Sequence, residues 1–381
     1  MTLESASTEG TRRLAQRAID GGNRASAYRT LGRTGLVTSA LGFGTYRIDD
    51  RTPGHTAALE EALCGGINLV DTSTNYTDGS SETCIGRVLR GQSREEIVVV
   101  SKVGYVQGQA LSMVRARERR GAAFPEMVKY ADGCWHCIHP EFIADQLDRS
   151  LERLGVGTVD VYLLHNPEYF FADARHRNRG SLEALREEFY DRIRRAFTHL
   201  EAEVQRGRIA FYGVSSNSFG APAGEAEATS LERMWTIAGE VAGGHHFAVS
   251  QMPANLFEGG AMLTRNSVGG RRTALQFAQG QNLAVLANRP LNAFHENHLI
   301  RLADTPVRKS ELHALVDPFL PPECRKESLS RKALAILMNT TGVTCVLNGM
   351  RQLDYVDDSL GVLRTPPFDL DLRLYEAFGR T

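Results

Sequence analysis

Eight short runs of hydrophobic residues recur along the chain, and segments with helical spacing of apolar positions lie between most of them. Continuous rather than alternating hydrophobicity is typical of strands that are covered on both faces. Several of the intervening segments end in Gly, where a helix stops. Eight strand–helix units that close on themselves predict an α/β fold of the (β/α)8 TIM barrel class. The strand runs fall at 39–46, 67–73, 97–103, 159–165, 209–215, 247–253, 283–289 and 343–349, and the helical segments at 55–66, 140–155, 197–207, 230–244 and 330–342.

The two ends of this pattern and three of its connections differ from the repeat. Residues 1–27 are polar and rich in Ser, Thr, Gly and Arg, which predicts a mobile or loosely docked extension ahead of one barrel domain over 28–381. Short β-prone runs with Gly-containing turns follow, and they predict an N-terminal β-hairpin. Long loops leave the carboxyl ends of the third, fourth and seventh strands, at roughly 105–139, 167–180 and 291–327. We expect them to shape a substrate pocket at the C-terminal face.

Composition narrows the class of protein. A net charge of -1, from 44 basic and 45 acidic side chains, gives no field that would attract nucleic acid or an anionic membrane surface. No stretch approaches the ~18 apolar residues of a membrane span. Six scattered cysteines and an N-terminus without a secretory pattern indicate a reducing compartment. We therefore expect a cytoplasmic protein with a small-molecule partner, no nucleic acid and no membrane, in an oligomeric state that the sequence does not indicate.

Four polar side chains, of kinds that together move a proton at a carbonyl, fall at the ends of three successive predicted strands. Asp71 ends the second strand and Tyr76 follows in its loop, while Lys102 and His165 lie at the ends of the next two. Barrel strands lie ~4.8 Å apart and share one carboxyl face, so these side chains can converge. Each residue alone has an ordinary structural explanation, such as a cap or a core histidine. Their joint occurrence at one face indicates catalysis.

The chemistry of these residues predicts a carbonyl reductase. We expect the Lys102 ammonium to lower the pKa of the Tyr76 phenol, and Asp71 to keep that ammonium charged. Tyr76 would then donate a proton to a carbonyl oxygen, while His165 hydrogen-bonds the same oxygen and stabilises its developing charge. No protein side chain delivers hydride to the carbon, so a nicotinamide cofactor is implied.

These motifs resemble those of the aldo-keto reductase family, over about residues 28–363. The segment YRTLGRTGLVTSALGFGTY is similar to the family's bottom hairpin and first strand, and DTSTNYTDGSSETCIGRVLRG to its aspartate and tyrosine signature. VSKVG is similar to its lysine strand and LLHNP to its histidine strand, although Asn166 stands where many members have Trp. The resemblance implies reduction of an aldehyde or ketone to an alcohol, with a catalytic tetrad of Asp71, Tyr76, Lys102 and His165.

The same resemblance implies that NADP(H) binds across the barrel mouth without a Rossmann domain. Ser215, Ser216 and Gln251 correspond to the groups that hold the carboxamide, and Arg351 to the residue that contacts the 2′-phosphate, which favours NADPH over NADH. The other implied cofactor contacts are Gly44, Thr45, Asn288, Arg289, Pro290, Leu291, Gly349, Tyr355 and Ser359.

Asn288 departs from the family pattern, because an aromatic residue generally stacks on the nicotinamide at this position. The platform would be missing or supplied by Phe294 or by another loop aromatic. Arg289 is expected either to bind a phosphate or to pair with an acidic neighbour. Candidate pocket residues mix aromatic and polar character, which suits a sugar or an oxygenated cyclic ketone. They are Tyr46, Trp135, His136, Asn166 and Tyr169, with Phe170, Phe171 and Arg175 as further candidates on the loops.

One further motif and three rival functions stay open. Cys134 and Cys137 lie close to two histidines in GCWHCIHPEF, but without a second ligand pair we expect no metal and instead a lid edge anchored by Trp135. A labile disulfide is the alternative. The rival functions are a Schiff-base enzyme that uses Lys102 as nucleophile, a non-catalytic NADP(H)-binding regulatory or redox-sensing barrel, and an enzyme that uses bound nicotinamide for internal redox in an elimination or isomerisation.

Overall fold

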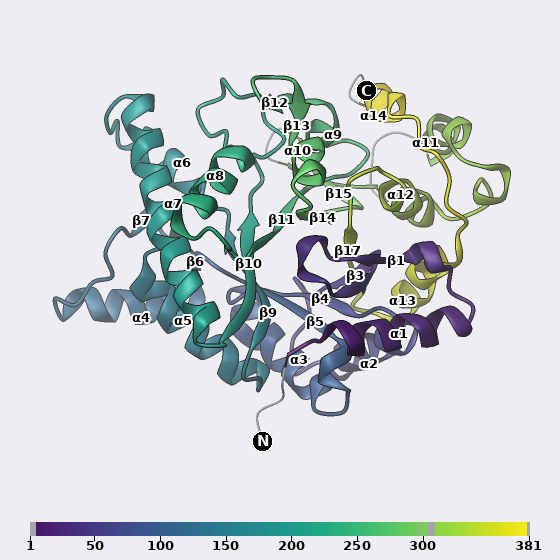
Figure 1. Ribbon diagram of the computed structural model, residues 1–381, viewed down its shortest axis with the longest axis horizontal. Helices are drawn as coiled ribbons and strands as arrows, with labels where there is room; N and C mark the ends of the chain where they lie inside the picture. Colours follow the sequence, from purple (N-terminus) through teal and green to yellow (C-terminus); the bar gives the residue numbers. More distant parts are fainter. Residues whose placement is uncertain (1–4, 296–297, 303–308, 379–381) are drawn as a thin grey trace.

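Eight parallel strands close into a barrel in the order in which they occur along the chain (Figure 1). The computed structural model describes residues 5–295, 298–302 and 309–378. All eight predicted runs form barrel strands, and the predicted (β/α)8 TIM barrel is confirmed. The strands are β3 (Leu41–Gly44), β4 (Leu69–Asp71), β5 (Val98–Val103), β9 (Val159–His165), β10 (Ile209–Ser215), β11 (Phe247–Pro253), β14 (Ala284–Asn288) and β17 (Cys345–Gly349).

At least one helix follows each barrel strand, and one helix after each strand packs on the outside of the sheet (Figure 1). One of them, α7, is longer than the predicted segment 197–207, because the Ser181 hydroxyl accepts from the amide of Ala184 and caps the helix much earlier in the chain. The helices are α2 (Pro53–Cys64), α3 (Ser80–Leu89), α5 (Pro140–Leu154), α7 (Leu182–Gln205), α8 (Leu231–Val241), α10 (Ala274–Gly280), α12 (Leu329–Met338) and α13 (Leu353–Leu360).

The barrel strands are buried on both faces, which explains their continuous hydrophobicity. Along β5, Val98 and Val100 belong to a cluster inside the barrel, whereas Val99 packs in the larger core between strands and helices. Successive strand residues face opposite sides of a sheet. Lys102 therefore continues the inward series of Val98 and Val100, one layer nearer the carboxyl face.

The amino-terminal face of the barrel is closed by the predicted hairpin and by a helix that precedes it. Strands β1 (Tyr28–Thr30) and β2 (Val37–Ser39) pair antiparallel, and Leu31 in their loop is buried within the interior cluster. Helix α1 (Thr8–Asp20) lies in the segment expected to be mobile or loosely docked. Its Leu14 is 7% exposed, and its Arg17 donates two hydrogen bonds to Glu96, at 2.8 and 2.7 Å. These contacts are those of a docked helix, while the division into extension and barrel stays a prediction.

The three long loops carry structure of their own beyond the carboxyl ends of the strands. After β5, a three-stranded sheet in the order β6–β8–β7 combines with one helix. No helix among the described residues is long and apolar enough to cross a membrane. The elements of these three loops are β6 (Tyr105–Val106), α4 (Gly108–Arg119), β7 (Val128–Ala131), β8 (Cys134–His136), α6 (Tyr169–His176), β15 (Asn292–His295), β16 (His298–Arg301) and α11 (Lys309–Val316). Outside them, α9 (Gly260–Leu263), β12 (Arg265–Ser267) and β13 (Arg272–Thr273) follow β11, and α14 (Arg373–Phe378) lies near the C-terminus.

Candidate active site

The last inward position of several barrel strands carries a polar residue. On β4, β5 and β9 these positions follow the interior residues Leu69, Val100 and Leu163 by two places. Because side chains alternate along a strand, all of them point to the barrel interior at its carboxyl face. They form a polar layer on top of an apolar one: Asp71, Lys102, His165, Ser215, Gln251 and Asn288.

Lys102 lies at the centre of a hydrogen-bonded group that includes Asp71 and Tyr76. Its ammonium donates to the Asp71 carboxylate and to the Thr72 carbonyl, each at 2.8 Å, and to the Tyr76 hydroxyl at 3.2 Å. The Lys102 side chain is fully buried, and the second Asp71 oxygen accepts from Gln251 at 2.8 Å. The structure thus brings together three of the four residues predicted from the sequence, with the geometry expected of an acid and its charged partner.

The charges of this group differ in one respect from expectation. Burial raises the pKa of Tyr76, and the Lys102 ammonium opposes that rise without reversing it, so the expected lowering of this pKa is wrong in its net direction. Burial disfavours the Lys102 ammonium, but Asp71 and Tyr76 outweigh it and hold the pKa of Lys102 above its ordinary value. Tyr76 is therefore a protonated phenol at neutral pH beside a permanent cation.

His165 lies against the same group as a neutral imidazole. Its ring is edge-on to that of Tyr76, with centroids 5.9 Å apart, and its Nδ1 lies 3.0 Å from the Ser73 hydroxyl. Burial and the Lys102 charge hold the pKa of His165 well below its usual range. The described residues offer no hydrogen bond to Nε2, which leaves this nitrogen for a ligand.

Beside the tetrad, Ser215 and Gln251, two of the three residues expected at the nicotinamide carboxamide, form a contact that Asn288, expected at the stacking position, extends. The Gln251 side-chain oxygen accepts from Ser215 at 3.0 Å and from Asn288 at 3.4 Å. The Asn288 side-chain oxygen is buried and has no hydrogen-bond partner among the described residues. An unpaired buried acceptor is costly unless a ligand supplies a donor. A carboxamide N–H supplies one, so these residues fit the group that the sequence implied.

Other expected cofactor residues lie at the mouth of the barrel or beneath it. Arg289 pairs with Glu258 at 2.9 Å, which confirms the expected acidic neighbour. Gly44 ends β3, the Thr45 hydroxyl donates to the Asp71 carbonyl at 2.8 Å, and Ser216 is held by Thr229 at 2.9 Å. Pro290 is buried and Leu291 half-buried just after β14, and the Phe294 side chain lies outside the described residues.

At the end of β17 the chain leaves an exposed surface ahead of α13. Gly349, Arg351 and Tyr355 are exposed there, and the amide groups of the first turn of α13 follow directly. Helix N-termini and basic side chains together favour phosphate. Ser359 differs, because it is buried and its hydroxyl accepts a hydrogen bond from Asn348 at 2.9 Å.

Aromatic side chains from the loop inserts surround His165. Tyr105 lies edge-on to His165, with centroids 4.6 Å apart, and its hydroxyl accepts from Asn166 at 2.8 Å. His136 approaches the His165 carbonyl oxygen at 2.7 Å and stacks on Tyr169. Tyr105 was missed in the sequence, although its place three residues after Lys102 at the same barrel face was a usable signal.

The remaining pocket candidates are placed differently. Tyr46 is 64% exposed, with its ring edge-on to that of Tyr76 at 5.2 Å. The ring of Trp135, in β8, lies under two cationic side chains, one of which is Lys129, 4.4 Å from the ring centroid. Phe170 and Phe171 pack on Phe189 in the core, and Arg175 pairs with Glu227 at the surface, so the role of these three further candidates in a pocket stays a prediction. Cys134 and Cys137 are free thiols rather than a disulfide.

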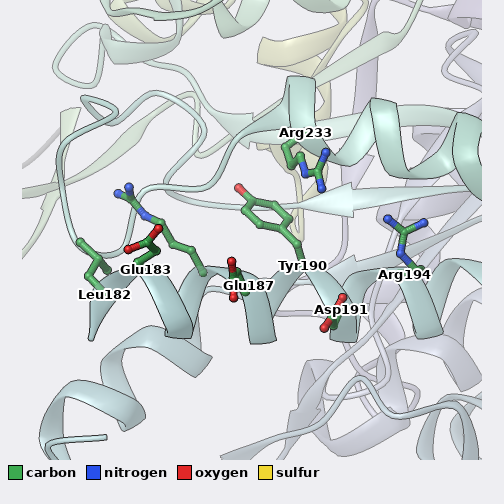
Figure 2. A pocket seen from close by; sticks show the side chains of 8 residues that line it. Leu182, Glu183, Glu187, Tyr190, Asp191, Arg194 and Arg233 are labelled. Carbon is green, nitrogen blue, oxygen red and sulfur yellow. The ribbon is translucent and has the colours of Figure 1, made fainter. Parts of the chain in front are cut away.

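A hollow of about 660 Å³ lies elsewhere, on the outer face of α7 and α8 (Figure 2). Acidic side chains and arginines alternate around it, and none of its residues comes from the carboxyl end of a barrel strand. It is therefore separate from the polar layer. Its lining residues are Leu182, Glu183, Arg186, Glu187, Tyr190, Asp191, Arg194 and Arg233.

Comparison with known proteins decides the family. The model of the "Aldo/keto reductase family" matches residues 40–294, which is more than half of the chain and includes all four tetrad positions. The chain belongs to the aldo/keto reductase family. This family comprises oxidoreductases that use a nicotinamide cofactor. The resemblance of the sequence motifs is thereby confirmed.

Individual relatives in the aldo/keto reductase family align with only part of their length. An NADH-specific methylglyoxal reductase from Escherichia coli (strain K12) is 31% identical over 35% of this chain and 40% of its own. A putative voltage-gated potassium channel subunit beta from Schizosaccharomyces pombe is 29% identical over 49% of this chain and 44% of its own. The chain thus spans less than half the length of these relatives. An aldo/keto reductase from Klebsiella pneumoniae, solved with NADP and acetate, shares the fold with a TM-score of 0.57 and 19% identity, over 93% of this chain and 94% of that one.

Proposed function

We propose that this protein reduces an aldehyde or ketone to an alcohol with NADPH, and that Tyr76 is the general acid. The observation that carries the proposal is the Lys102 ammonium, which bonds both the Asp71 carboxylate and the Tyr76 hydroxyl beside the neutral ring of His165. A phenol, a buried cation and a neutral imidazole at one strand-end face are the groups that protonate a carbonyl oxygen.

Each side chain has a defined part in this reaction. The bound nicotinamide supplies the hydride to the carbonyl carbon. Tyr76 holds its proton at neutral pH, since its pKa is raised by burial from an already high ordinary value of 10.0, and it gives that proton to the oxygen as negative charge develops there. Lys102 then stabilises the phenolate, and Asp71 keeps the lysine charged and fixed. His165 donates a hydrogen bond to the same oxygen and orients the substrate.

Cofactor binding follows from the residues of the barrel mouth. Ser215, Gln251 and Asn288 would hold the carboxamide, as supported by the unpaired Asn288 oxygen. Arg351 and the first turn of α13 would receive the adenosine phosphate, which favours NADPH. The Klebsiella structure holds NADP, whereas the Escherichia coli relative is NADH-specific, so Arg351 is the feature that argues for NADPH here.

The rival functions are less well supported by the site. A Schiff-base enzyme needs a neutral amine, but the Asp71 carboxylate and the raised pKa keep Lys102 an ammonium. A non-catalytic regulatory barrel would not need a complete proton-donating group, although one relative is named as a channel subunit. Internal redox in an elimination or isomerisation uses the same residues and differs only in consuming no net NADPH.

The loop aromatics favour a substrate with both apolar and oxygenated surface. Tyr105, His136 and Tyr169 present ring faces and edges near His165, and Asn166 adds an amide that bonds the Tyr105 hydroxyl. A sugar or an oxygenated cyclic ketone matches this mixture of ring stacking and hydrogen bonding.

A cofactor titration followed by a carbonyl screen tests the proposal. We expect the fluorescence of NADPH to change on binding, and its absorbance to decay when an aldehyde or ketone is reduced. A Tyr76→Phe variant is the control, because it retains the cofactor site and loses the acid. Tight NADPH binding with no turnover across aldehydes, ketones and sugars would contradict the reductase function and support the regulatory alternative. Turnover of substrate without loss of NADPH would support internal redox.

A further inference from the structure

The loop after β9 holds the loop after β10 at two points. The amide of Asn166 donates to the Ser215 carbonyl at 2.7 Å, and the amide of Asn217 donates to the Glu168 carboxyl group at 2.7 Å. Both loops start at the carboxyl ends of their strands, so these bonds lie directly beyond the polar layer of the barrel. The end of β10 is thus fastened to the segment that follows β9.

Of these two contacts, the one at Glu168 depends on a side chain. The Asn166 contact joins two backbone groups, whereas Glu168 contributes its carboxyl group. Glu168 is 7% exposed, and its second oxygen is buried without a hydrogen-bond partner among the described residues. A hydrogen bond inside the protein is stronger than one in water, so this contact restrains the Asn217 backbone.

Glu168 offers this acceptor in either protonation state. Burial raises the pKa of Glu168 from 4.5 to about 7. The protonated and the ionised carboxyl group each have an oxygen that can accept the Asn217 N–H, and the side-chain amide of a glutamine has one too. The contact therefore requires an oxygen at this position rather than a charge, which makes Glu168→Gln a conservative replacement.

The segment that Glu168 restrains carries groups expected at the nicotinamide carboxamide. The Ser215 hydroxyl donates to the Gln251 side chain at 3.0 Å, and the Ser216 amide donates to the Gln251 carbonyl at 3.0 Å. Asn217 follows directly, so a shift of its backbone would move both serines relative to Gln251. Binding groups must be held close to their productive geometry, and a displacement of ~1 Å is enough to weaken a site.

We propose that Glu168 is a positioning residue that sets Ser215 and Ser216 for the nicotinamide end of the cofactor. The proposal rests on the proposed function, because it takes NADPH as the ligand of these serines. Glu168 touches no cofactor atom in this scheme and acts through the Asn217 amide. Its effect is confined to one end of the cofactor, because the adenosine phosphate is expected at Arg351 and the first turn of α13, which follow a different strand.

Two ligands separate the two ends of the cofactor site in the full-length protein. NADPH occupies both ends, whereas adenosine 2′,5′-bisphosphate has the phosphorylated adenosine and no nicotinamide. We expect Glu168→Ala to raise the dissociation constant of NADPH ~10-fold, because the carboxamide contacts are displaced, and to leave that of the bisphosphate unchanged. Fluorescence titration of NADPH, and its displacement by the bisphosphate, give both constants at a temperature where circular dichroism shows every variant folded.

Two further variants separate this role from the loss of a buried carboxyl group as such. Glu168→Gln retains an oxygen acceptor and should bind NADPH as tightly as the wild type does. Glu201→Ala removes another buried carboxyl group, which accepts the amide of His246 at 2.7 Å just ahead of β11, at the opposite face of the barrel. This control should change neither dissociation constant.

The outcomes decide between positioning and a general structural role. Equal rises in both dissociation constants for Glu168→Ala, or no change in either, would overturn the proposal. A Glu168→Gln variant that binds NADPH as weakly as Glu168→Ala would overturn it too. A wild type that binds NADPH but reduces no carbonyl would instead refute the proposed reduction, while the two dissociation constants still decide the role of Glu168.

Discussion

At the scale of single residues, burial and a neighbouring cation have opposite effects on the pKa of the Tyr76 phenol. Burial raises the pKa of Tyr76, and Lys102 limits that rise without cancelling it. A general acid for reduction must be protonated before the reaction and able to lose its proton during it. Tyr76 meets the first condition through its ordinary pKa of 10.0, which burial raises further, and in the proposed reaction the Lys102 hydrogen bond at 3.2 Å would provide for the second.

Removing the phenolic hydroxyl tests the role of Tyr76 directly. We expect Tyr76→Phe to lower kcat by ~10²–10⁴, because general acid catalysis is lost, while NADPH affinity changes little. Steady-state kinetics and fluorescence titration of NADPH give the two quantities. Turnover equal to that of the wild type would remove Tyr76 from its assigned role.

The pH dependence of reduction follows from the same pKa. In the proposed reduction the reactive form of Tyr76 is protonated, and its raised pKa lies above the ordinary value of 10.0, so the reduction rate should fall only in strongly alkaline solution. His165 stays neutral because its pKa is well below 6.5, so it adds no acid limb near neutrality. Profiles of kcat between about pH 7 and pH 9 should therefore be flat. An alkaline fall centred near pH 8 would show that a different group donates the proton.

Cofactor choice is also decided by single residues. We expect Arg351→Ala to raise the dissociation constant for NADPH by ~10-fold or more and to leave that for NADH nearly unchanged, because only NADPH has a 2′-phosphate. Titrations of both cofactors measure this difference. Arg364→Ala is a matched control, because this substitution also removes one exposed arginine near α13. Equal effects on both cofactors would contradict a phosphate contact.

At the scale of elements, the helix ahead of the barrel contributes to stability through a few contacts. Leu14 is buried, whereas Arg12, two residues earlier on the same helix, is exposed. We expect Leu14→Ala to reduce the free energy of unfolding by ~2 kcal/mol, because a buried leucine is truncated, and Arg12→Ala to leave it nearly unchanged. Denaturant unfolding measures both. Equal stability of the two variants would indicate that α1 is loosely docked.

The lid after β5 was predicted as a long functional loop, but its internal order was not. Its strands are only two to four residues long, and β7 is exposed at three of its four positions. Such strands give no run of apolar residues and no clean alternation, so periodicity does not find them. They form because β8 lies between two partners, and because His136 packs against the His165 carbonyl and Tyr169.

At the scale of the whole molecule, one buried carboxyl links folding to pH. Glu168, directly after the His165 segment, is 7% exposed, and only one of its oxygens accepts a hydrogen bond, from the amide of Asn217 at 2.7 Å. Burial raises the pKa of Glu168 from 4.5 to about 7. The folded state therefore binds this proton more tightly than the unfolded state does.

The sign of the effect follows from that difference. The stability contributed by protonated Glu168 is fully present below pH 4.5 and is lost as the pH rises through about 7. We expect Glu168→Gln to remove this dependence and to reduce the fall in unfolding free energy between pH 4 and pH 8 by on the order of 3 kcal/mol. Denaturant titrations at several pH values measure it. If the unfolding free energy of Glu168→Gln depended on pH as that of the wild type does, the Glu168 carboxyl would not be as strongly desolvated as its burial indicates.

The sequence by itself determined the barrel and the shared face of four polar residues. Strands covered on both faces must be hydrophobic throughout, and the carboxyl ends of barrel strands must share one face, so the positions of Asp71, Tyr76, Lys102 and His165 follow from local pattern alone. The net pKa of Tyr76 depends on burial, which is a property of the packed barrel, and the sequence argument therefore gave its direction wrongly.

Only the tertiary structure decided which distant residues meet. Gln251 reaches Asp71 across 180 positions of the chain, and Ser73 reaches His165 across 92. Phe170 and Phe171 resembled pocket residues in sequence but turn into the core against Phe189, whereas Tyr105 turns to His165. Local periodicity fixes the face of a strand on which a residue lies, but the partner on that face is set by the closure of the barrel and the packing of its loops.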